Sequence, residues 1–296
     1  MEKVGLIGLG NMGQALATRW LNGGFEVVGF DPYASVTIEH QHFKRVPSLE
    51  EVANSVSCIW LMVPAGDAVT QTVQKLAALC APGTVIIDGG NSFFKDSVKH
   101  ADFLRTQQIS FLDCGVSGGL FGKERGYALM IGGDKKVFEQ HEALFKALAA
   151  RDGYAYVGAS GAGHYVKMVH NGIEYALLQA YAQGFHLLKE GRYKDLDLAK
   201  ISDVWHHGAI IDSFILELLH DIFKHDQAFT TISGKVAQTG MGLWTVREAH
   251  ECKIPITLVE EAVKIRDASQ KTGGDYSTKL VALLRKKFGG HVIESV

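Results

Sequence analysis

The sequence predicts an α/β chain, in which an N-terminal doubly wound parallel sheet is followed by an all-helical C-terminal domain. Short apolar runs alternate with stretches of helical spacing over residues 1–160. A glycine-rich motif stands where the first apolar run meets the first helical stretch. Beyond residue 160 the helical spacing continues without a further strand pattern. Alternation followed by helices alone is typical of a helix-covered parallel sheet joined to a helical domain.

Each expected strand is a short apolar run that ends at a glycine, a proline or a polar residue, as buried parallel strands do. Helical spacing fills the intervals between these runs. The expected strands cover residues 4–8, 25–30, 56–63, 84–88, 109–113 and 128–131, and the expected helices cover 12–21, 66–80, 95–106 and 134–149.

Residues 158–163, Gly-Ala-Ser-Gly-Ala-Gly, form a small-residue hinge between the two patterns. A proline-free stretch with helical periodicity follows, to about residue 190. We therefore expect one domain over residues 1–160 and a second over residues 161–296. Breaks between the later helices are expected at Gly191, Gly208, Gly240, Pro255 and Gly273-Gly274.

Composition argues against several classes of partner. A formal net charge of −2 gives no basic surplus for nucleic acid. No apolar run approaches the ~20 residues that cross a bilayer, and the chain begins in a strand pattern rather than a signal peptide. The four cysteines show no CxxC spacing and His206-His207 has no third ligand, so we expect reduced thiols, no metal and a cytoplasmic location.

The motif Gly8-Leu9-Gly10-Asn11-Met12-Gly13 has the GxGxxG spacing of a dinucleotide-binding turn. In such a turn the first glycine makes the bend, the second lets a pyrophosphate approach the backbone, and the third lets helix and strand pack closely. The helix N-terminus offers free N–H groups to the phosphates. The motif alone is weak, but here Asp31 ends the next strand, so we expect a nicotinamide dinucleotide rather than an unrelated glycine turn.

Asp31 also indicates which dinucleotide is bound. A carboxylate at this place accepts hydrogen bonds from the adenosine ribose hydroxyls and repels a 2′-phosphate. Pro32 and Tyr33 follow, with no arginine beside them to bind that phosphate. We therefore expect NAD in preference to NADP. If Asp31 is only a turn residue before Pro32, this preference loses its support.

Lys167, His170, Asn171 and Glu174 are spaced to share one face of the long helix. At about 100° per residue they fall within a sector of roughly 100°. The residues that flank them are apolar, and a half-buried lysine–glutamate pair is costly unless it is used. We interpret this face as functional, with a solvated helix face as the alternative.

Two polar segments follow predicted strands, at residues 88–92 (Asp-Gly-Gly-Asn-Ser) and 117–119 (Ser-Gly-Gly). Ligands of open α/β sheets bind outside the carboxyl ends of the strands. Either segment taken singly is better explained as a tight turn.

Together these motifs resemble the decarboxylating 6-phosphogluconate dehydrogenase family, in a short-chain form within the β-hydroxyacid dehydrogenases. The run Lys167-Met168-Val169-His170-Asn171-Gly172-Ile173-Glu174-Tyr175 is the most specific part. The wider β-hydroxyacid dehydrogenases usually carry two asparagines in place of His170-Asn171 and lack the glutamate. The other matching segments are the GxGxxG motif, Val63-Pro64-Ala65-Gly66, Asp88-Gly89-Gly90-Asn91 and Gly115-Val116-Ser117-Gly118-Gly119.

The resemblance implies oxidative decarboxylation of 6-phospho-D-gluconate to D-ribulose 5-phosphate and CO2, with hydride transfer to NAD. It implies that Lys167 is the general base and that Glu174 protonates the enediol. The implied substrate-binding residues are Asn91, Ser117, Gly118, Gly119, His170 and Asn171, with Tyr175 and Arg266 at the phosphate. The implied cofactor-binding residues are Gly8, Leu9, Gly10, Asn11, Met12, Gly13, Asp31, Val63, Pro64, Ala65 and Asn91.

The run from Arg285 to His291 resembles the tail of that family. The resemblance implies that both residues reach the substrate site of a neighbouring subunit, so a homodimer or homotetramer is expected. The alternative is a basic helix end with a glycine stop.

Two positions depart from the family pattern. Thr239 stands where long members carry a lysine, and Asp31-Pro32-Tyr33 replaces the asparagine-arginine-threonine that selects NADP. Thr239 leaves open a related β-hydroxyacid dehydrogenase that acts on another sugar acid, phosphorylated or not, or on a 3-hydroxy acid. A non-catalytic NAD(H)-binding regulator is a third alternative, which the presence of Lys167 and Glu174 disfavours.

Overall fold

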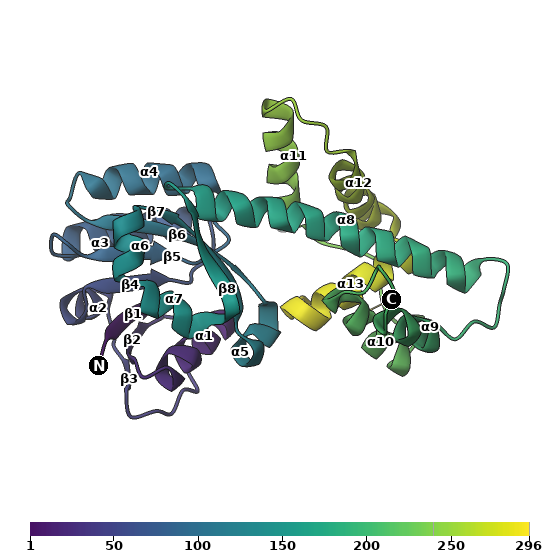
Figure 1. The fold of residues 1–296 in the computed structure, drawn as a ribbon, viewed down its shortest axis with the longest axis horizontal. Coiled ribbons are helices and arrows are strands. Elements are labelled where there is room, and N and C mark those ends of the chain that lie inside the picture. Colours follow the sequence, from purple (N-terminus) through teal and green to yellow (C-terminus); the bar gives the residue numbers. More distant parts are fainter. Residues whose placement is uncertain (239, 296) are drawn as a thin grey trace. The chain divides into compact units, whose positions relative to one another are not determined.

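The computed structural model describes residues 1–238 and 240–295. The chain divides into two compact units, Met1–Met168 and Val169–Val296 (Figure 1). None of the helices in the described ranges combines the length and the apolar character that crossing a membrane requires.

The first unit is built on a sheet of eight strands, counted over the described residues, in the order β3-β2-β1-β4-β5-β6-β7-β8. The predicted doubly wound α/β architecture is thereby confirmed. The strands are β1 (Lys3–Ile7), β2 (Glu26–Phe30), β3 (Phe43–Arg45), β4 (Cys58–Leu61), β5 (Val85–Asp88), β6 (Ser110–Ser117), β7 (Tyr127–Gly133) and β8 (Ala149–Gly158).

The sheet differs from the prediction at three strands. β3 has no apolar run to mark it, because two of its three residues are exposed. β8 begins at Ala149, directly after a helix, and alternates only loosely between buried and exposed residues. β7 runs antiparallel to β6, because only the short segments η1 (Gly119–Phe121) and α5 (Gly122–Arg125) join them, too few residues for a parallel crossover.

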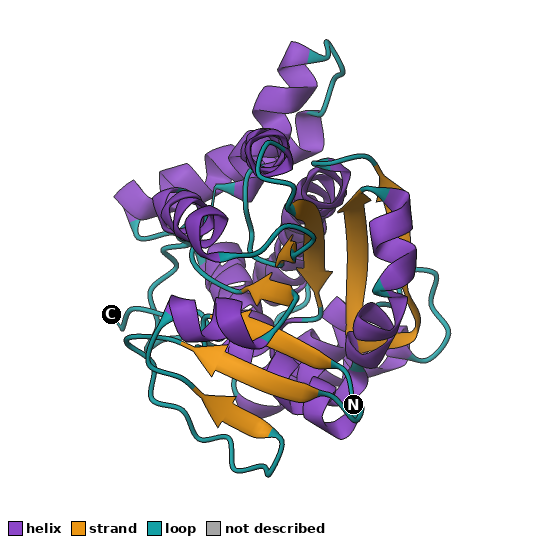
Figure 2. Cartoon of the chain, turned by 90° about the vertical axis from the view of Figure 1, so that its left-hand side faces the viewer, coloured by secondary structure: helices purple, strands orange, loops and turns teal. Residues whose placement is uncertain are grey.

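Helices cover both faces of this sheet (Figure 2). Successive strand residues therefore enter different cores: Ile59 and Trp60 are both fully buried, but they lie in separate hydrophobic clusters. Burial on both faces explains why these strands read as continuous apolar runs. Trp20 and Trp60 meet edge to face at 5.3 Å, as core residues. The helices are α1 (Asn11–Asn22), α2 (Leu49–Ser55), α3 (Asp67–Leu79), α4 (Phe94–Arg105), α6 (Lys135–Gln140) and α7 (Glu142–Leu148).

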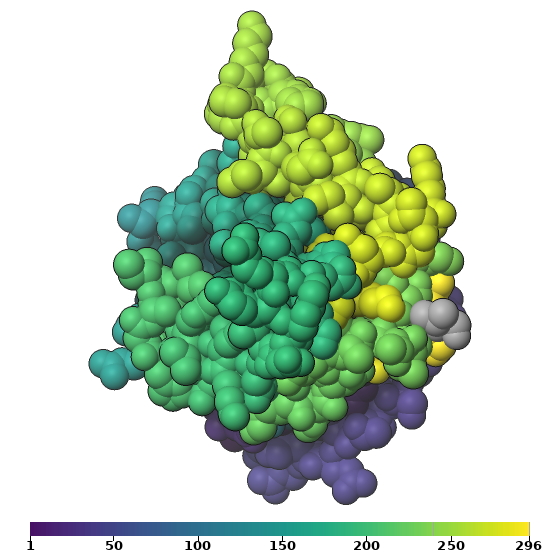
Figure 3. Space-filling view, turned by 90° about the vertical axis from the view of Figure 1, so that its right-hand side faces the viewer, coloured from purple at the N-terminus to yellow at the C-terminus, as the bar shows by residue number. Residues whose placement is uncertain are grey.

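Over its described residues, the second unit is built of helices, as expected, with an isolated bridge between Ile232 and Ser295. Much of the surface seen in Figure 3 belongs to this unit. Phe185 packs against Trp205 and Phe223, with ring centroids 5.3 and 4.8 Å away, and so joins three helices in one core. The helices are the remainder of α8 (Ala162–Glu190), with α9 (Leu198–His206), α10 (Phe214–His225), α11 (Met241–Glu251), α12 (Thr257–Thr272) and α13 (Tyr276–Gly289).

The first turn of α8 is fixed by a carboxylate from β6. Asp113 is fully buried, and its two oxygens accept hydrogen bonds from the backbone N–H groups of Gly161 (2.6 Å) and His164 (2.9 Å). These N–H groups have no partner within the helix, so the carboxylate satisfies them and meets the positive end of the helix dipole. The His164 ring, also fully buried, lies 2.7 Å from the Ser97 hydroxyl through Nδ1. The start of α8 therefore belongs to the first unit.

Candidate functional site

The predicted glycine turn joins β1 to α1. A β-carbon at Gly8, where φ is +98°, would lie 2.3 Å from the Met62 carbonyl oxygen, and one at Gly13 would lie 2.0 Å from that of Gly8. A β-carbon at Gly10 would meet nothing within 4 Å. Gly10 is also the N-cap of α1, and it provides no side-chain cap. The outer glycines thus allow close packing, while open space at the helix N-terminus fits a dinucleotide pyrophosphate.

Asp31 follows β2 and organises the loop after it. Its Oδ2 accepts a hydrogen bond from Leu9 N at 2.7 Å, and its Oδ1 accepts from Tyr33 N and Ala34 N at 2.8 and 2.9 Å. Partial burial opposes ionisation, but these three N–H groups and the positive charge of Arg45 keep the pKa of Asp31 below its ordinary value. Asp31 is therefore a carboxylate at neutral pH.

Arg45 was not expected beside this loop. It lies at the end of β3, and its Nη2 donates hydrogen bonds to the carbonyl oxygens of Asp31 (2.9 Å) and Ala34 (3.2 Å). The sequence shows no arginine adjacent to Asp31-Pro32-Tyr33, but pairing of β3 with β2 brings one there. The sequence contains little that would predict this contact, because Arg45 is a basic residue in a segment without an apolar run.

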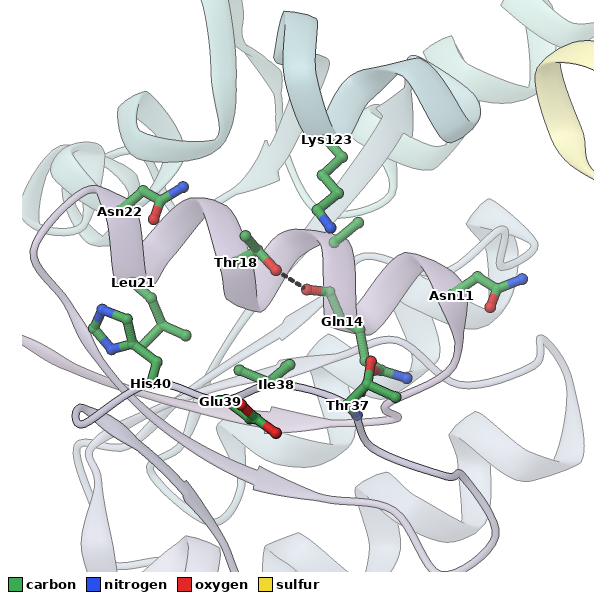
Figure 4. Close-up of a pocket in the computed structure, with 11 residues that line it drawn as sticks. Asn11, Gln14, Thr18, Leu21, Asn22, Thr37, Ile38, Glu39, His40 and Lys123 are labelled. Atoms are coloured by element: carbon green, nitrogen blue, oxygen red, sulfur yellow. Dashed lines mark hydrogen bonds between the residues drawn. The ribbon is translucent and has the colours of Figure 1, made fainter.

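A groove of about 430 Å³ follows the outer face of α1 from Asn11 (Figure 4). Gln14 lines it and links two parts of the first unit. Its Nε2 donates to the carbonyl oxygens of Leu9 and Ser35, and its Oε1 accepts from the backbone N–H and the hydroxyl of Thr37. The loop after β2 is thus tied to the glycine turn.

The remaining predicted loops of this unit leave one edge of the sheet, because β1, β4, β5 and β6 are parallel. The fully buried Asp88 shapes the loop after β5: its Oδ1 accepts from Gly90 N at 3.0 Å, and its Oδ2 accepts from the Ser92 hydroxyl at 2.6 Å. This carboxylate holds Asn91 in an exposed position. Val63, Pro64 and Ala65 follow β4, Ser117 is the last residue of β6, and Gly118 and Gly119 come directly after it.

Lys167 lies one turn after His164 on α8, and its side chain is 5% exposed. A β-carbon at Gly115 of β6 would lie only 2.4 Å from the Lys167 β-carbon. The absence of a side chain at Gly115 therefore lets the lysine pack directly on the sheet. Gly115 and Asp113 are two residues apart on β6, so both face α8.

His170, Asn171 and Glu174 follow along the same helix and are half-buried. Because α8 is continuous from Ala162 to Glu190, the seven-residue offset from Lys167 to Glu174 amounts to two turns and leaves both on one helix face. The His170 ring Nδ1 lies 3.0 Å from Asn171 Oδ1.

The second unit gathers cationic side chains around Tyr175. Arg266 of α12 is 1% exposed, and its Cζ lies 3.3 Å from the centroid of the Tyr175 ring. Over the described residues, neither Nη1 nor Nη2 of Arg266 has a hydrogen-bond partner. Burial, with the nearby charge of Arg285, lowers the pKa of Arg266 to about 10, although Tyr175 and Glu174 oppose this. A buried guanidinium with unpaired nitrogens fits an anionic ligand.

Arg285 joins Arg266 in a cationic cluster, and the imidazole of His291 lies beside both. Arg285 of α13 is 7% exposed, and burial lowers its pKa against the opposing effect of Tyr175 and Glu174. Burial lowers the pKa of His291, and the charges of Arg285 and Arg266 lower it further.

Arg285 and His291 both lie near Arg266 of their own chain, because Gly290, at the end of α13, has a φ of +68° and turns the tail back. Their expected contribution to the site of a neighbouring subunit stays a prediction. A β-carbon at Gly289 would lie 2.8 Å from the His291 ring, so a side chain at this position would displace the ring from its present place. Thr239, the other position that bears on the phosphate, lies outside the described residues.

Two family models match nearly the whole chain. The NAD binding domain of 6-phosphogluconate dehydrogenase matches residues 3–160, and the 6-phosphogluconate dehydrogenase C-terminal domain matches residues 163–292. A curated relative from Haloferax volcanii, named NAD(+)-dependent, decarboxylating 6-phosphogluconate dehydrogenase, is 41% identical over 299 residues, which cover 98% of each chain.

Two solved structures are also similar. The 6-phosphogluconate dehydrogenase of Plasmodium falciparum is 26% identical with a TM-score of 0.80, over 93% of this chain and 65% of that one. The 3-hydroxyisobutyrate dehydrogenase of Salmonella typhimurium is 20% identical with a TM-score of 0.76, over 95% of this chain and 99% of that one, and so shares the fold. Since both halves match the models of one family, and a full-length relative agrees, the chain belongs to the 6-phosphogluconate dehydrogenase family of oxidoreductases.

Proposed function

We propose that this protein oxidatively decarboxylates 6-phospho-D-gluconate to D-ribulose 5-phosphate and CO2, with NAD as the hydride acceptor. The observation that carries the proposal is the buried cationic cluster around Arg266, whose unpaired nitrogens fit a phosphate group. The name of the Haloferax relative supports the same reaction and the same cofactor.

NAD would be held by the first unit. The glycine turn would receive the pyrophosphate, Asp31 would accept a ribose hydroxyl, and Met12, Asn91 and the Val63-Pro64-Ala65 segment would border the nicotinamide end. When bound, NAD accepts a hydride from C3 of the substrate.

Lys167 would take the proton of the C3 hydroxyl as the hydride leaves C3. A general base must hold the uncharged amine at the start of this step, and Lys167 is 5% exposed. The protonated Lys167 would then stabilise the oxyanion that develops at C3 when the C1–C2 bond breaks and CO2 departs. Glu174 would complete the reaction by giving a proton to the carbon that lost CO2, which yields the ketose phosphate.

The remaining site residues would bind and orient the substrate. Arg266, Arg285, His291 and Tyr175 would hold the phosphate, since guanidinium groups form strong charge-assisted hydrogen bonds with it. The hydroxyls and the carboxylate would be held by Asn91, Ser117, Gly118, Gly119, His170 and Asn171.

An initial-rate assay with 6-phosphogluconate, run with NAD and NADP in parallel, tests this proposal. We expect NADH and CO2 in equal amounts and a higher kcat/KM with NAD. The second candidate is a β-hydroxyacid dehydrogenase for an unphosphorylated acid, which Thr239 suggests. Turnover of gluconate or 3-hydroxyisobutyrate well above that of 6-phosphogluconate would replace the first proposal with the second.

We also propose that the protein is a homo-oligomer. Within the second unit, α8 exposes the apolar side chains of Ile173 (54%), Leu177 (46%) and Leu187 (73%). Their spacing follows the alternating four- and three-residue steps of a helix–helix seam, with Ala180 and Gly184 at the intervening steps. An apolar stripe of this kind is typical of a surface that packs against another chain.

A further inference from the structure

The loop after β2, residues 31–37, meets the adenosine half of a dinucleotide in this fold. Three side chains hold it: Asp31 from within, Gln14 from α1 and Arg45 from β3. The charges beside the loop decide which dinucleotide is accepted, because NAD and NADP differ only by a phosphate on the adenosine ribose.

Most of the hydrogen-bonding capacity of the Asp31 carboxylate is already used. An ionised carboxylate has about four acceptor positions. Three are filled by Leu9 N, Tyr33 N and Ala34 N. One position on Oδ2 is left for a ribose hydroxyl, whereas a phosphate would face the negative charge with no proton to donate.

Arg45 places a positive charge at the same loop. A single nitrogen, Nη2, makes both of its hydrogen bonds, to the carbonyl oxygens of Asp31 and Ala34. Over the described residues, Nε and Nη1 have no acceptor on the protein. The side chain is exposed, and its charge is close enough to Asp31 to stabilise the carboxylate. The guanidinium is thus held in a fixed orientation by Nη2, and the N–H groups of Nε and Nη1 remain available to a ligand.

We propose that Arg45 is a specificity-determining residue that can bind a 2′-phosphate. In the wild type, the negative charge of Asp31 cancels the attraction of Arg45 for that phosphate. Asp31 alone then accounts for the discrimination against NADP, and neutralising this one carboxylate turns the loop into a 2′-phosphate site. Guanidinium groups suit this task, because they bind phosphate through paired N–H groups. The inference rests on the proposed dinucleotide site but not on the reaction.

A double-mutant cycle tests the proposal by binding alone. The variants are Asp31→Asn, Arg45→Ala and the double variant, each titrated with 5′-AMP and with 2′,5′-ADP in competition with NADH or NADPH fluorescence. These two probes differ only by the 2′-phosphate. We expect Asp31→Asn to tighten 2′,5′-ADP binding at least about tenfold, the gain that about 1.4 kcal/mol gives, and Arg45→Ala to remove the gain.

Two controls separate this role from simple bracing of the loop. Lys44→Ala removes the same charge from the neighbouring residue of β3, which faces the opposite side of the sheet, and should change neither Kd. In the Asp31→Asn background, Arg45→Ala should leave 5′-AMP binding within about twofold. The proposal would be overturned if Arg45→Ala weakened the binding of 5′-AMP and of 2′,5′-ADP equally. It would also be overturned if Asp31→Asn did not increase the affinity for 2′,5′-ADP.

The outcome is distinguishable from failure of the proposed function. A wild-type preference for NADP in the rate assay would remove the proposed NAD preference, whereas the cycle would still report whether Arg45 and Asp31 act on the 2′-phosphate. Absence of turnover with any sugar acid would leave the nucleotide titrations unaffected.

Discussion

Lys167 packs directly on the backbone of Gly115: a β-carbon at Gly115 would lie 2.4 Å from the β-carbon of the lysine and 2.9 Å from the carbonyl oxygen of Gly163. Both neighbours belong to the first turns of α8, so neither moves without the helix. The position of the proposed base is therefore set by the closeness of β6 and α8.

Gly115→Ala should accordingly displace Lys167 and lower kcat. Misplacement of a catalytic group by about 1 Å costs on the order of 100-fold in rate, and overpacking costs about 1–3 kcal/mol of stability. Steady-state rates and thermal unfolding measure the two effects. Lys146→Ala is the control, because Lys146 is an exposed residue of α7 that belongs neither to the site nor to the apolar stripe of α8. Wild-type kcat in Gly115→Ala would contradict this account.

Lys167→Ala should lower kcat by about 1000-fold or more, and Glu174→Gln by about 100-fold, since positioned acid–base groups contribute on the order of 100- to 10,000-fold each. Both variants should bind NADH as the wild type does, because neither residue is assigned to the cofactor. Rates and NADH fluorescence titrations give the two readouts. Full activity in either variant would refute its assigned role.

His291 should make anion binding depend on pH. Burial and two neighbouring arginines lower its pKa in the free protein, and a bound dianion would raise it again. Anion binding is then coupled to the uptake of a proton by His291. The affinity for the anion should increase as the pH falls through about 6.5, the ordinary pKa of histidine, and it should level off once His291 is already protonated in the free protein.

Sulfate is the suitable probe, because it remains a dianion across this range whereas phosphate does not. We expect the inhibition constant of sulfate, measured against 6-phosphogluconate, to decrease as the pH is lowered in the wild type. His207→Gln, which removes an exposed histidine, is the control and should show the same decrease. The pH dependence should be lost in His291→Gln. An unchanged dependence in that variant would show that another group takes up the proton.

Leu187→Glu should shift the protein to a smaller species in light scattering after size exclusion, because a carboxylate in an apolar seam would be buried without a partner. Leu258→Glu is the control, since Leu258 is similarly exposed (77%) but lies on α12, away from the α8 stripe. A monomeric wild type would disprove the homo-oligomer outright.

The sequence by itself determined those features whose signal is local. The GxGxxG spacing, the apolar runs and the two-turn offset from Lys167 to Glu174 follow from backbone periodicity, and the structure contains the turn, the sheet and an unbroken α8. The strands without such a signal, β3 and β8, were not foreseen, because edge strands owe their place to pairing with a neighbour rather than to their own apolar pattern.

The tertiary structure alone decided which distant residues meet. Arg45 reaches the Asp31 loop through the pairing of β3 with β2, Asp113 caps a helix that begins 49 positions later at Ala162, and the turn at Gly290 returns His291 to Arg266. Each of these contacts joins two segments that are distant in the sequence, and the local pattern of neither segment predicts the other. Their physical basis is the satisfaction of buried charges and N–H groups, which exists only once the chain has folded.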